Sequence, residues 1–129
     1  DVRSTVGAMR TVDVATELAS ARSALDAAGV DAVFPADADV VPLRNRELFG
    51  WTVREAVTNV IRHSGARQCT VVVEAGRIEI SDDGVGTSGS ISDDGHGLRG
   101  LAERVKASNG SLSVGKSAAG GFRVEVVSA

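Results

Sequence analysis

Residues 44–63 read RNRELFGWTVREAVTNVIRH and form the longest helical pattern in the chain. Apolar side chains recur there at intervals of three and four residues, the period of an amphipathic α-helix. They are Phe49, Val53, Ala56, Val57, Val60 and Ile61. Because Gly50 weakens such a helix by about 1 kcal/mol relative to alanine, another element must hold it in place. We therefore expect a long helix that packs its apolar face on a sheet.

The polar residues of this helix form a second stripe. Glu55, Asn59 and then Arg62 or His63 follow at spacings of four and three or four, which places them on one face. Asparagine is not favoured inside a helix, and beside Glu, Arg and His it suggests a site. Its amide oxygen suits Mg²⁺, a hard cation that keeps several waters. A solvated face with paired charges gives the same pattern, so the stripe alone does not decide.

The flanking elements predict an α+β two-layer sandwich, with helices packed on one face of a mixed, mostly antiparallel sheet. Asp13 can cap a helix that Gly29 ends. Ala75-Gly76 is a tight connection that predicts a hairpin. The other elements that we expect are strands over 30–34, 69–74, 77–81, 111–114 and 122–127, a loop over 35–42, and a helix over 98–109 that Gly110 stops.

Composition limits the classes of function. The 129 residues, 43% hydrophobic and 24% charged, fit one soluble domain. A net charge of −3 argues against a nucleic-acid partner. Cys69, the single cysteine, excludes an internal disulfide and favours a reducing compartment. No apolar run approaches the ~20 residues that cross a bilayer, so we expect a cytoplasmic domain, and a membrane anchor elsewhere in the full-length protein stays open.

Two glycine-rich clusters follow the long helix. Asp82-Asp83-Gly84-Val85-Gly86 comes directly after a strand, where the carboxylate can accept a hydrogen bond from adenine N6 and the glycines allow close approach of backbone to ligand. Residues 95–101, GHGLRGL, lead into a helix whose first amides and dipole would suit phosphate. A hairpin turn and a loop entering an ordinary helix would explain either cluster alone.

In this order, the three clusters resemble the N, G1 and G2 boxes of the Bergerat-fold (GHKL) ATPases. Residues 55–66, EAVTNVIRHSGA, and 95–114, GHGLRGLAERVKASNGSLSV, resemble the catalytic ATP-binding domain of sensor histidine kinases of the DesK/NarL-partner subclass. The short loop between the second and third boxes is similar to the compact lids of that subclass. Residues 1–10, DVRSTVGAMR, resemble the end of a dimerisation helix. We therefore expect residues 1–12 to be its tail and linker and residues 13–129 to be the catalytic domain.

The resemblance implies that the domain binds ATP and Mg²⁺ and transfers the γ-phosphate to a histidine. Glu55 would act on the attacking group, and Asn59 would ligate Mg²⁺. Asp82 would bond the adenine amine. The residues implied to shape the adenine pocket or lie near the phosphates are Gly84, Gly86, Arg62, His63, Gly95, His96, Gly97 and Leu98.

The resemblance also implies partners. The acceptor histidine would lie on the dimerisation domain of the same kinase, expected upstream of Asp1, so neither His63 nor His96 would be the acceptor. A response regulator would act downstream, and nucleic acid would not bind. We expect a monomer for the isolated domain and a homodimer for the full kinase.

Two departures and two alternatives accompany this interpretation. Phe122 follows Gly121 where many relatives have Gly-Thr, which puts a hydroxyl contact near the adenine in doubt. Asp83 stands where Asn is frequent and would add negative charge beside the nucleotide. An anti-sigma-factor serine kinase shares the fold and the boxes, and a nucleotide-binding sensor without phosphotransfer would keep the pocket alone. Trp51 and Cys69 are expected to be core residues with no catalytic part.

Overall fold

The computed structural model describes residues 12–84 and 96–129, except for the side chains of Ser64 and His96. The predicted dimerisation-helix tail, apart from Val12, lies outside these residues, as does the segment 85–95. The helices and strands are α2 (Val14–Ala27), β1 (Asp31–Val33), α3 (Leu43–Asn59), the π-helical turn η1 (Val60–Ser64), β2 (Gln68–Val73), β3 (Arg77–Asp82), α4 (His96–Ala107), β4 (Ser111–Lys116) and β5 (Phe122–Val127).

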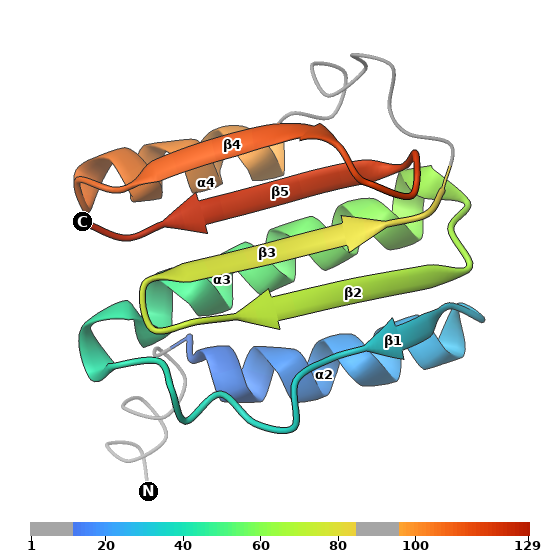
Figure 1. Cartoon of the computed structure of the whole chain (residues 1–129), viewed down its shortest axis with the longest axis horizontal. Helices are drawn as coiled ribbons and strands as arrows, with labels where there is room; N and C mark the ends of the chain where they lie inside the picture. Colours follow the sequence, from blue (N-terminus) through green and yellow to red (C-terminus); the bar gives the residue numbers. More distant parts are fainter. Residues whose placement is uncertain (1–11, 85–95) are drawn as a thin grey trace, which may run out of the picture.

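The five strands form one sheet in the order β1-β2-β3-β5-β4. β1 pairs with β2 in parallel, and the other three pairings are antiparallel. Helices α2, α3 and α4 all lie behind the sheet in the view of Figure 1. The predicted α+β sandwich, with its mixed, mostly antiparallel sheet and helices on one face, is therefore confirmed.

Strand alternation explains which side chains reach the core. Ile78 and Ile80 of β3 lie opposite Val126 and Val124 of β5, and all four are buried under the helices. From α3, the predicted apolar stripe is buried as far as Val60. Full burial of a side chain of this size stabilises the fold by about 1.5–3 kcal/mol, so this apolar layer holds the helices on the sheet.

Gly50 is explained by close packing of α3 on the start of α2. A Cβ at position 50 would lie 2.9 Å from Cγ1 of Val12 and 3.0 Å from the carbonyl carbon of Asp13. The same two helices are joined by ion pairs from Arg46 to Asp13 at 2.8 Å and from Arg54 to Glu17 at 2.7 Å. Packing against α2 thus offsets the low helix propensity of glycine.

The helix ends agree with the sequence at two places and differ at a third. Asp13 caps α2 by accepting a 3.0 Å hydrogen bond from the amide of Ala15, and Gly29 ends it with φ +77°. At the end of α4 the positive φ belongs to Asn109, at 62°, and not to Gly110. Gly110 is needed for another reason, because a Cβ there would lie 2.6 Å from the carbonyl oxygen of Val127.

Trp51 lies where α3 meets α4. The guanidinium carbon of Arg104 is 3.8 Å from the ring centroid, and that of Arg54 is 4.7 Å away. The ring is half-buried rather than fully enclosed, and its Nε1 is sealed from solvent without a partner among the described residues. The contact of Arg104 with Trp51, about 0.5–1 kcal/mol at an exposed site, joins α4 to α3, whereas Arg54 lies on the same helix as Trp51.

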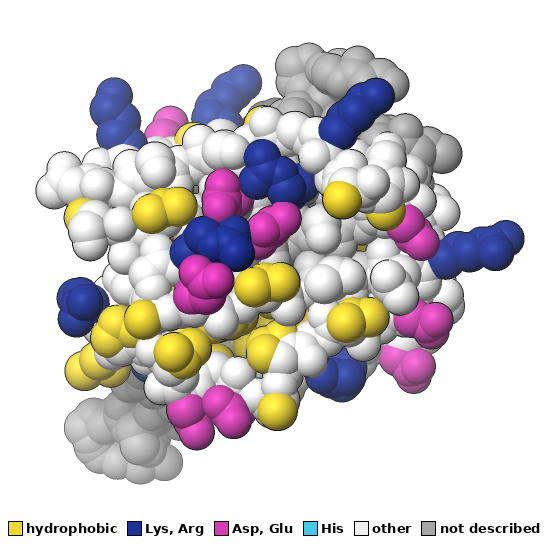
Figure 2. All heavy atoms as spheres, in the orientation of Figure 1, with side chains coloured by type: hydrophobic (Ala, Val, Ile, Leu, Met, Phe, Trp, Pro, Cys, Tyr) yellow, Lys and Arg dark blue, Asp and Glu magenta, His cyan; other side chains and the backbone are white. Residues whose placement is uncertain are grey.

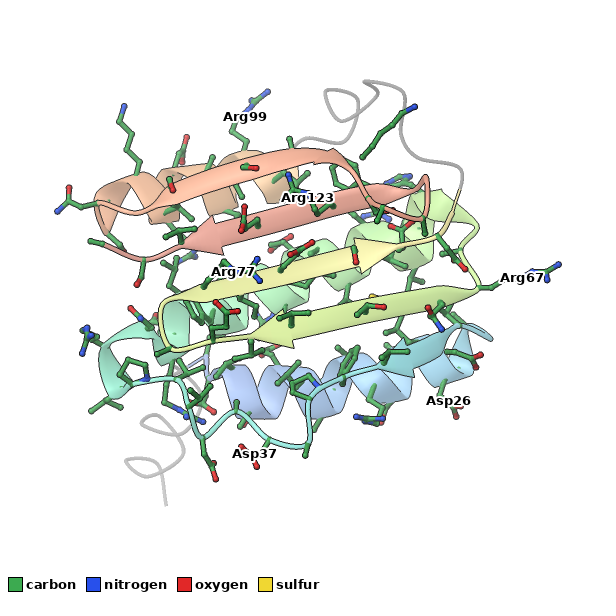
Figure 3. The ribbon with its side chains drawn as sticks, viewed as in Figure 1. Asp26, Asp37, Arg67, Arg77, Arg99 and Arg123 are labelled. Atoms are coloured by element: carbon green, nitrogen blue, oxygen red, sulfur yellow. The ribbon has the colours of Figure 1, made fainter. Side chains whose placement is uncertain are left out.

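The face of the sheet away from the helices carries a charged network. Arg77 bonds Glu79 and Glu125, each at 2.8 Å, and Arg123 reaches Glu125 at 3.3 Å. Figure 2 shows this cluster of basic and acidic side chains on the open face, and Figure 3 shows that Arg77 and Arg123 come from neighbouring strands. The hydrogen bonds that Arg77 donates to Glu74, Glu79 and Glu125 raise its pKa further above the ordinary value, so its charge is permanent. None of the described helices is long and apolar enough to cross a membrane.

Candidate functional site

The elements that carry three of the predicted site residues, Glu55, Asn59 and Asp82, end at one edge of the molecule. β3 and α3 run in the same direction, so their C-terminal ends lie at the same edge, beside the turn between β4 and β5 (Figure 1). Arg67 projects away from this edge (Figure 3). The fold therefore brings together the end of the helix that carries Glu55 and Asn59 and the end of the strand that carries Asp82.

Asn59 and Glu55 occupy the last two turns of α3 and are half-buried. The Asn59 side chain makes no capping hydrogen bond to η1, so its amide oxygen is not used by the helix end. Glu55 lies within electrostatic range of Arg54, which is itself bonded to Glu17. Helix α3 therefore holds both side chains in place, and the Asn59 side chain is not used to cap the helix end.

The helical pattern does not continue as a regular α-helix through His63. Residues 60–64 form the π-helical turn, and Arg62 and His63 lie within it as exposed side chains. The i→i+5 bonds of a π-helix wind the chain more widely than the spacing rule assumed, so Arg62 and His63 are rotated from the expected stripe. The same turn leaves Ile61, predicted to be on the apolar face, 38% exposed. Single π-turns of this kind are frequent at functional sites.

Asp82 ends β3 with its side chain turned into the protein and only 4% exposed. Its Oδ1 accepts hydrogen bonds from the amide of Gly84 at 2.8 Å and from the amide of Phe122 at 3.4 Å. No described residue donates to Oδ2, and that oxygen is not sealed from solvent. A carboxylate oriented through one oxygen, with the second left available, can accept a hydrogen bond from an amine of a ligand.

Gly121 and Ser117, which the sequence did not single out, complete the surroundings of Asp82. A Cβ at position 121 would overlap the backbone oxygen and Oδ1 of Asp82. The Ser117 hydroxyl donates to the backbone oxygen of Asp82 at 2.6 Å and accepts from the amide of Gly121 at 2.8 Å. The only sequence signal was the glycine before Phe122, which resembles the glycine of the Gly-Thr pair in relatives.

Asp83 has a structural role that the sequence did not predict. Its exposed side chain accepts hydrogen bonds through Oδ1 from the amides of Arg67 at 2.9 Å and Gln68 at 3.0 Å. These two backbone donors hold the pKa of the Asp83 carboxyl below its ordinary value. The expected negative charge is present, but it is neutralised in part by the start of β2.

Cys69 lies opposite Asp82 in the β2–β3 ladder and is fully buried, as predicted. Burial first, and then the nearby negative charge of Asp82, raise the pKa of its thiol to about 12. The thiol is therefore neutral at physiological pH and is a packing residue in the wall beside Asp82.

The third predicted cluster is described only in part. Gly86 and Gly95 lie outside the described residues, while His96 and Gly97 are the first residues of α4. Leu98 packs its side chain in the core and is 6% exposed, so only its backbone can face a ligand. The first turn of α4 carries no acidic residue. The first amides of a helix have no partner within the helix itself, an arrangement that favours an anion. Among the described residues, no group of three or more His, Cys, Asp or Glu is placed to hold a metal ion.

Known proteins resemble this chain in sequence and in fold. No family model matches the sequence. The chain is 34% identical to the sensor histidine kinase DesK of Bacillus subtilis over 122 residues, 88% of this chain and 33% of the relative. It is also 34% identical to the sensor histidine kinase YvfT of the same bacterium over 119 residues, 88% of this chain and 32% of the relative. This chain belongs to the sensor histidine kinase family.

Solved structures agree on the fold of this family member. The ATP-binding domain of PrrB from Mycobacterium tuberculosis matches with a TM-score of 0.60 and 23% identity, over 91% of this chain and 93% of that chain. The histidine kinase domain of the blue-light activated kinase EL346 from Erythrobacter litoralis matches with a TM-score of 0.67 and 20% identity, over 90% of this chain and 64% of that chain. The chain spans about a third of the length of the curated relatives it matches.

Proposed function

We propose that this domain binds Mg-ATP at the edge formed by α3, β3 and the β4–β5 turn, and transfers the γ-phosphate to a histidine of a sensor kinase. The observation that carries the proposal is the hydrogen bonding of the Asp82 carboxylate. Two backbone amides orient its Oδ1, while Oδ2 has no donor among the described residues. An oriented acceptor beside a glycine-lined approach suits the N6 amine of adenine, which donates and cannot accept.

The other residues of the site would act on the phosphates and the attacking group. The first amides of α4 would receive phosphate oxygens, since a helix N-terminus favours negative charge. Arg62 and His63, on η1 at the end of α3, would add positive charge or hydrogen-bond donors there. Glu55, one turn before Asn59, would orient or polarise the attacking imidazole. Phosphoryl transfer needs mainly positioning and charge stabilisation, and these groups offer both.

Asn59 fits the role of a magnesium ligand. Its amide oxygen is not used to cap η1, its side chain is half-buried, and it lies on a rigid helix. Mg²⁺ keeps most of its waters and binds through few protein ligands plus substrate phosphates, so one amide oxygen suffices. When bound, the ion would neutralise charge on the phosphates.

The partners follow from the kinase proposal. The acceptor would be a histidine on the dimerisation domain of the same kinase, and a response regulator would take the phosphoryl group onward, in the cytoplasm. DesK and YvfT are themselves sensor histidine kinases, which supports the proposal without testing this chain. The serine-kinase and sensor alternatives differ in acceptor chemistry, which the last experiment of the Discussion separates.

Nucleotide binding is tested first, by titration calorimetry of the 129-residue chain with ATP in Mg²⁺ and in EDTA. We expect saturable binding that weakens without Mg²⁺. At 100 times Kd the nucleotide should stabilise the fold by about 2.7 kcal/mol. Absence of saturation at millimolar Mg-ATP would overturn the proposal.

A further inference from the structure

We infer that Ser117 is a positioning residue for nucleotide recognition and acts through Asp82. The inference rests on the proposed function and adds a residue that lies outside the three boxes. Ser117 sits in the turn between β4 and β5, after Lys116 and before the glycine pair Gly120-Gly121. It is only 8% exposed, which is unusual for a polar residue in a surface turn.

The Ser117 hydroxyl is shared between two backbone groups of the site. It donates to the carbonyl oxygen of Asp82 at 2.6 Å and accepts from the amide of Gly121 at 2.8 Å. The bond to Asp82 joins the turn to the end of β3, 35 residues earlier in the chain. One side chain thereby fixes the strand end that carries the adenine acceptor.

The sheet ladder does not supply this bond itself. The paired residues of β3 and β5 end at Ser81 and Arg123. The next amide of β5, that of Phe122, points to Oδ1 of Asp82 and not to its backbone oxygen. The backbone oxygen of Asp82 therefore depends on the Ser117 hydroxyl. Without that hydroxyl, a buried carbonyl would lose its donor, and the strand end would have reason to shift.

A shift of the strand end would act directly on the ligand. Gly121 lies so close to Asp82 that a Cβ there would overlap both of the Asp82 oxygens already named. Because there is so little free space, a movement of the Asp82 backbone would change the direction in which the carboxylate and its Oδ2 point. Recognition of the exocyclic amine needs a well-aligned acceptor, because hydrogen bonds weaken steeply as their angle departs from linear.

The role of Ser117 also accounts for the hydroxyl that this chain lacks because Phe122 stands where many relatives have threonine. Phe122 is buried in the core at 7% exposure and has no hydroxyl to offer. The hydroxyl beside Asp82 comes instead from Ser117, on the other side of the turn. Selectivity for adenine should accordingly depend on Ser117.

The experiment compares Mg-ATP with Mg-ITP, whose base carries an oxygen in place of the exocyclic amine. We expect the parent chain to prefer ATP. Ser117→Ala should raise the Kd for ATP about tenfold and leave the Kd for ITP within about twofold. Ser117→Thr, which keeps the hydroxyl, should restore the preference. In an Asp82→Asn background, Ser117→Ala should add little, because the two residues act on one contact.

Ser113→Ala is the matched control, since that hydroxyl bonds only Arg123 on the open face of the sheet. It should bind both nucleotides like the parent. If Ser117→Ala does not fold, Ser117→Cys keeps the shape with a weaker donor and should give an intermediate ATP preference. Equal weakening of ATP and ITP binding by Ser117→Ala, or an unchanged ATP preference in a folded variant, would overturn the role of Ser117. Neither result would overturn the proposed function. A parent chain that binds neither nucleotide would overturn the proposed function and this inference with it.

Discussion

Gly121 lies against Asp82 so closely that a Cβ at position 121 would overlap the backbone oxygen and Oδ1 of Asp82. This contact joins the residue just before β5 to the last residue of β3, at the proposed adenine end of the site. It explains why a residue far from the three boxes is expected to control nucleotide binding.

Gly121→Ala should therefore impair both folding and binding. Overpacking of this kind costs about 1–3 kcal/mol, so the urea midpoint should fall, and the Kd for Mg-ATP should rise well beyond tenfold. Gly115→Ala is the control, because a Cβ there would meet only a side-chain nitrogen of Arg123 at 3.9 Å. Gly115→Ala should keep the parent affinity. Parent-like affinity in Gly121→Ala would show that the contact does not matter for the ligand.

Substitutions of Asp82 and of Asn59 should change nucleotide binding in different ways. Asp82→Asn keeps the shape but can turn a donor toward the adenine amine, and loss of a charge-assisted bond of about 1.5–3 kcal/mol raises the Kd more than tenfold. Asn59→Ala should leave adenine recognition intact and remove the difference between binding in Mg²⁺ and in EDTA. Calorimetry of both variants in both buffers checks this. Parent-like ATP binding by Asp82→Asn would contradict the adenine assignment.

Local patterns were enough to predict the elements. The cap at Asp13, the stop at Gly29 and the hairpin at Ala75-Gly76 depend on neighbouring residues, and the structure has each of them. β5 spans 122–127 as expected. The periodicity of α3 also gave the buried stripe, because the face of the sheet that it contacts is apolar.

Features that depend on distant contacts could not be predicted. Spacing alone cannot show that the chain changes to a π-turn at Val60, so Ile61, expected on the apolar face, is 38% exposed. Ser117 and Gly121 acquire their meaning from Asp82, which only the sheet brings beside them. Asp83 was expected only to add charge beside the nucleotide, because its bonds to the start of β2 are invisible in the sequence.

Asp13 should make the stability of the domain sensitive to acid. Its pKa is lowered, first by the hydrogen bond from Arg46 and also by the amide of Ala15. A depressed folded pKa means that the stabilisation is present above the unfolded value of 3.8 and is lost as pH falls through the lower folded value. Asp13→Asn keeps a capping oxygen but loses the charge, whereas Asp13→Ala loses both, about 0.5–2 kcal/mol for the cap alone. Urea midpoints should rank parent, Asn and Ala at neutral pH, and the parent and Asn variants should converge in acid.

Cys69 should be inert in the native domain and should affect stability at alkaline pH. Burial first, and then the charge of Asp82, raise the pKa of its thiol from 9.0 to about 12. A raised folded pKa means that this stabilisation is complete below 9.0 and is lost as pH rises toward about 12. A thiol-specific disulfide reagent at about pH 8 should react only after denaturant is added. Cys69→Ala should lower stability at neutral pH and lose less of it on going alkaline, and rapid labelling of the native protein would contradict the buried assignment.

Phosphotransfer is the last and most specific prediction. The attacking imidazole must reach the phosphorus in line, at about 3–3.5 Å. His63 lies on η1 at the end of the helix that carries Asn59, and His96 begins α4, so both would contact the bound nucleotide rather than attack its phosphate.

Mixed with a separate dimerisation segment that bears the acceptor histidine, the domain and radiolabelled ATP should give acid-labile, base-stable phosphate on that segment. Glu55→Gln should slow single-turnover transfer while the Kd for ATP stays close to that of the parent, because the proposed role of Glu55 is at the attacking group. Thr58→Ala, an exposed change on the same helix, is the matched control and should transfer like the parent. Acid-stable label on a serine of a partner would favour the serine-kinase alternative, binding without any transfer would favour the sensor, and stoichiometric label on His63 or His96 would contradict the placement of the acceptor outside this domain.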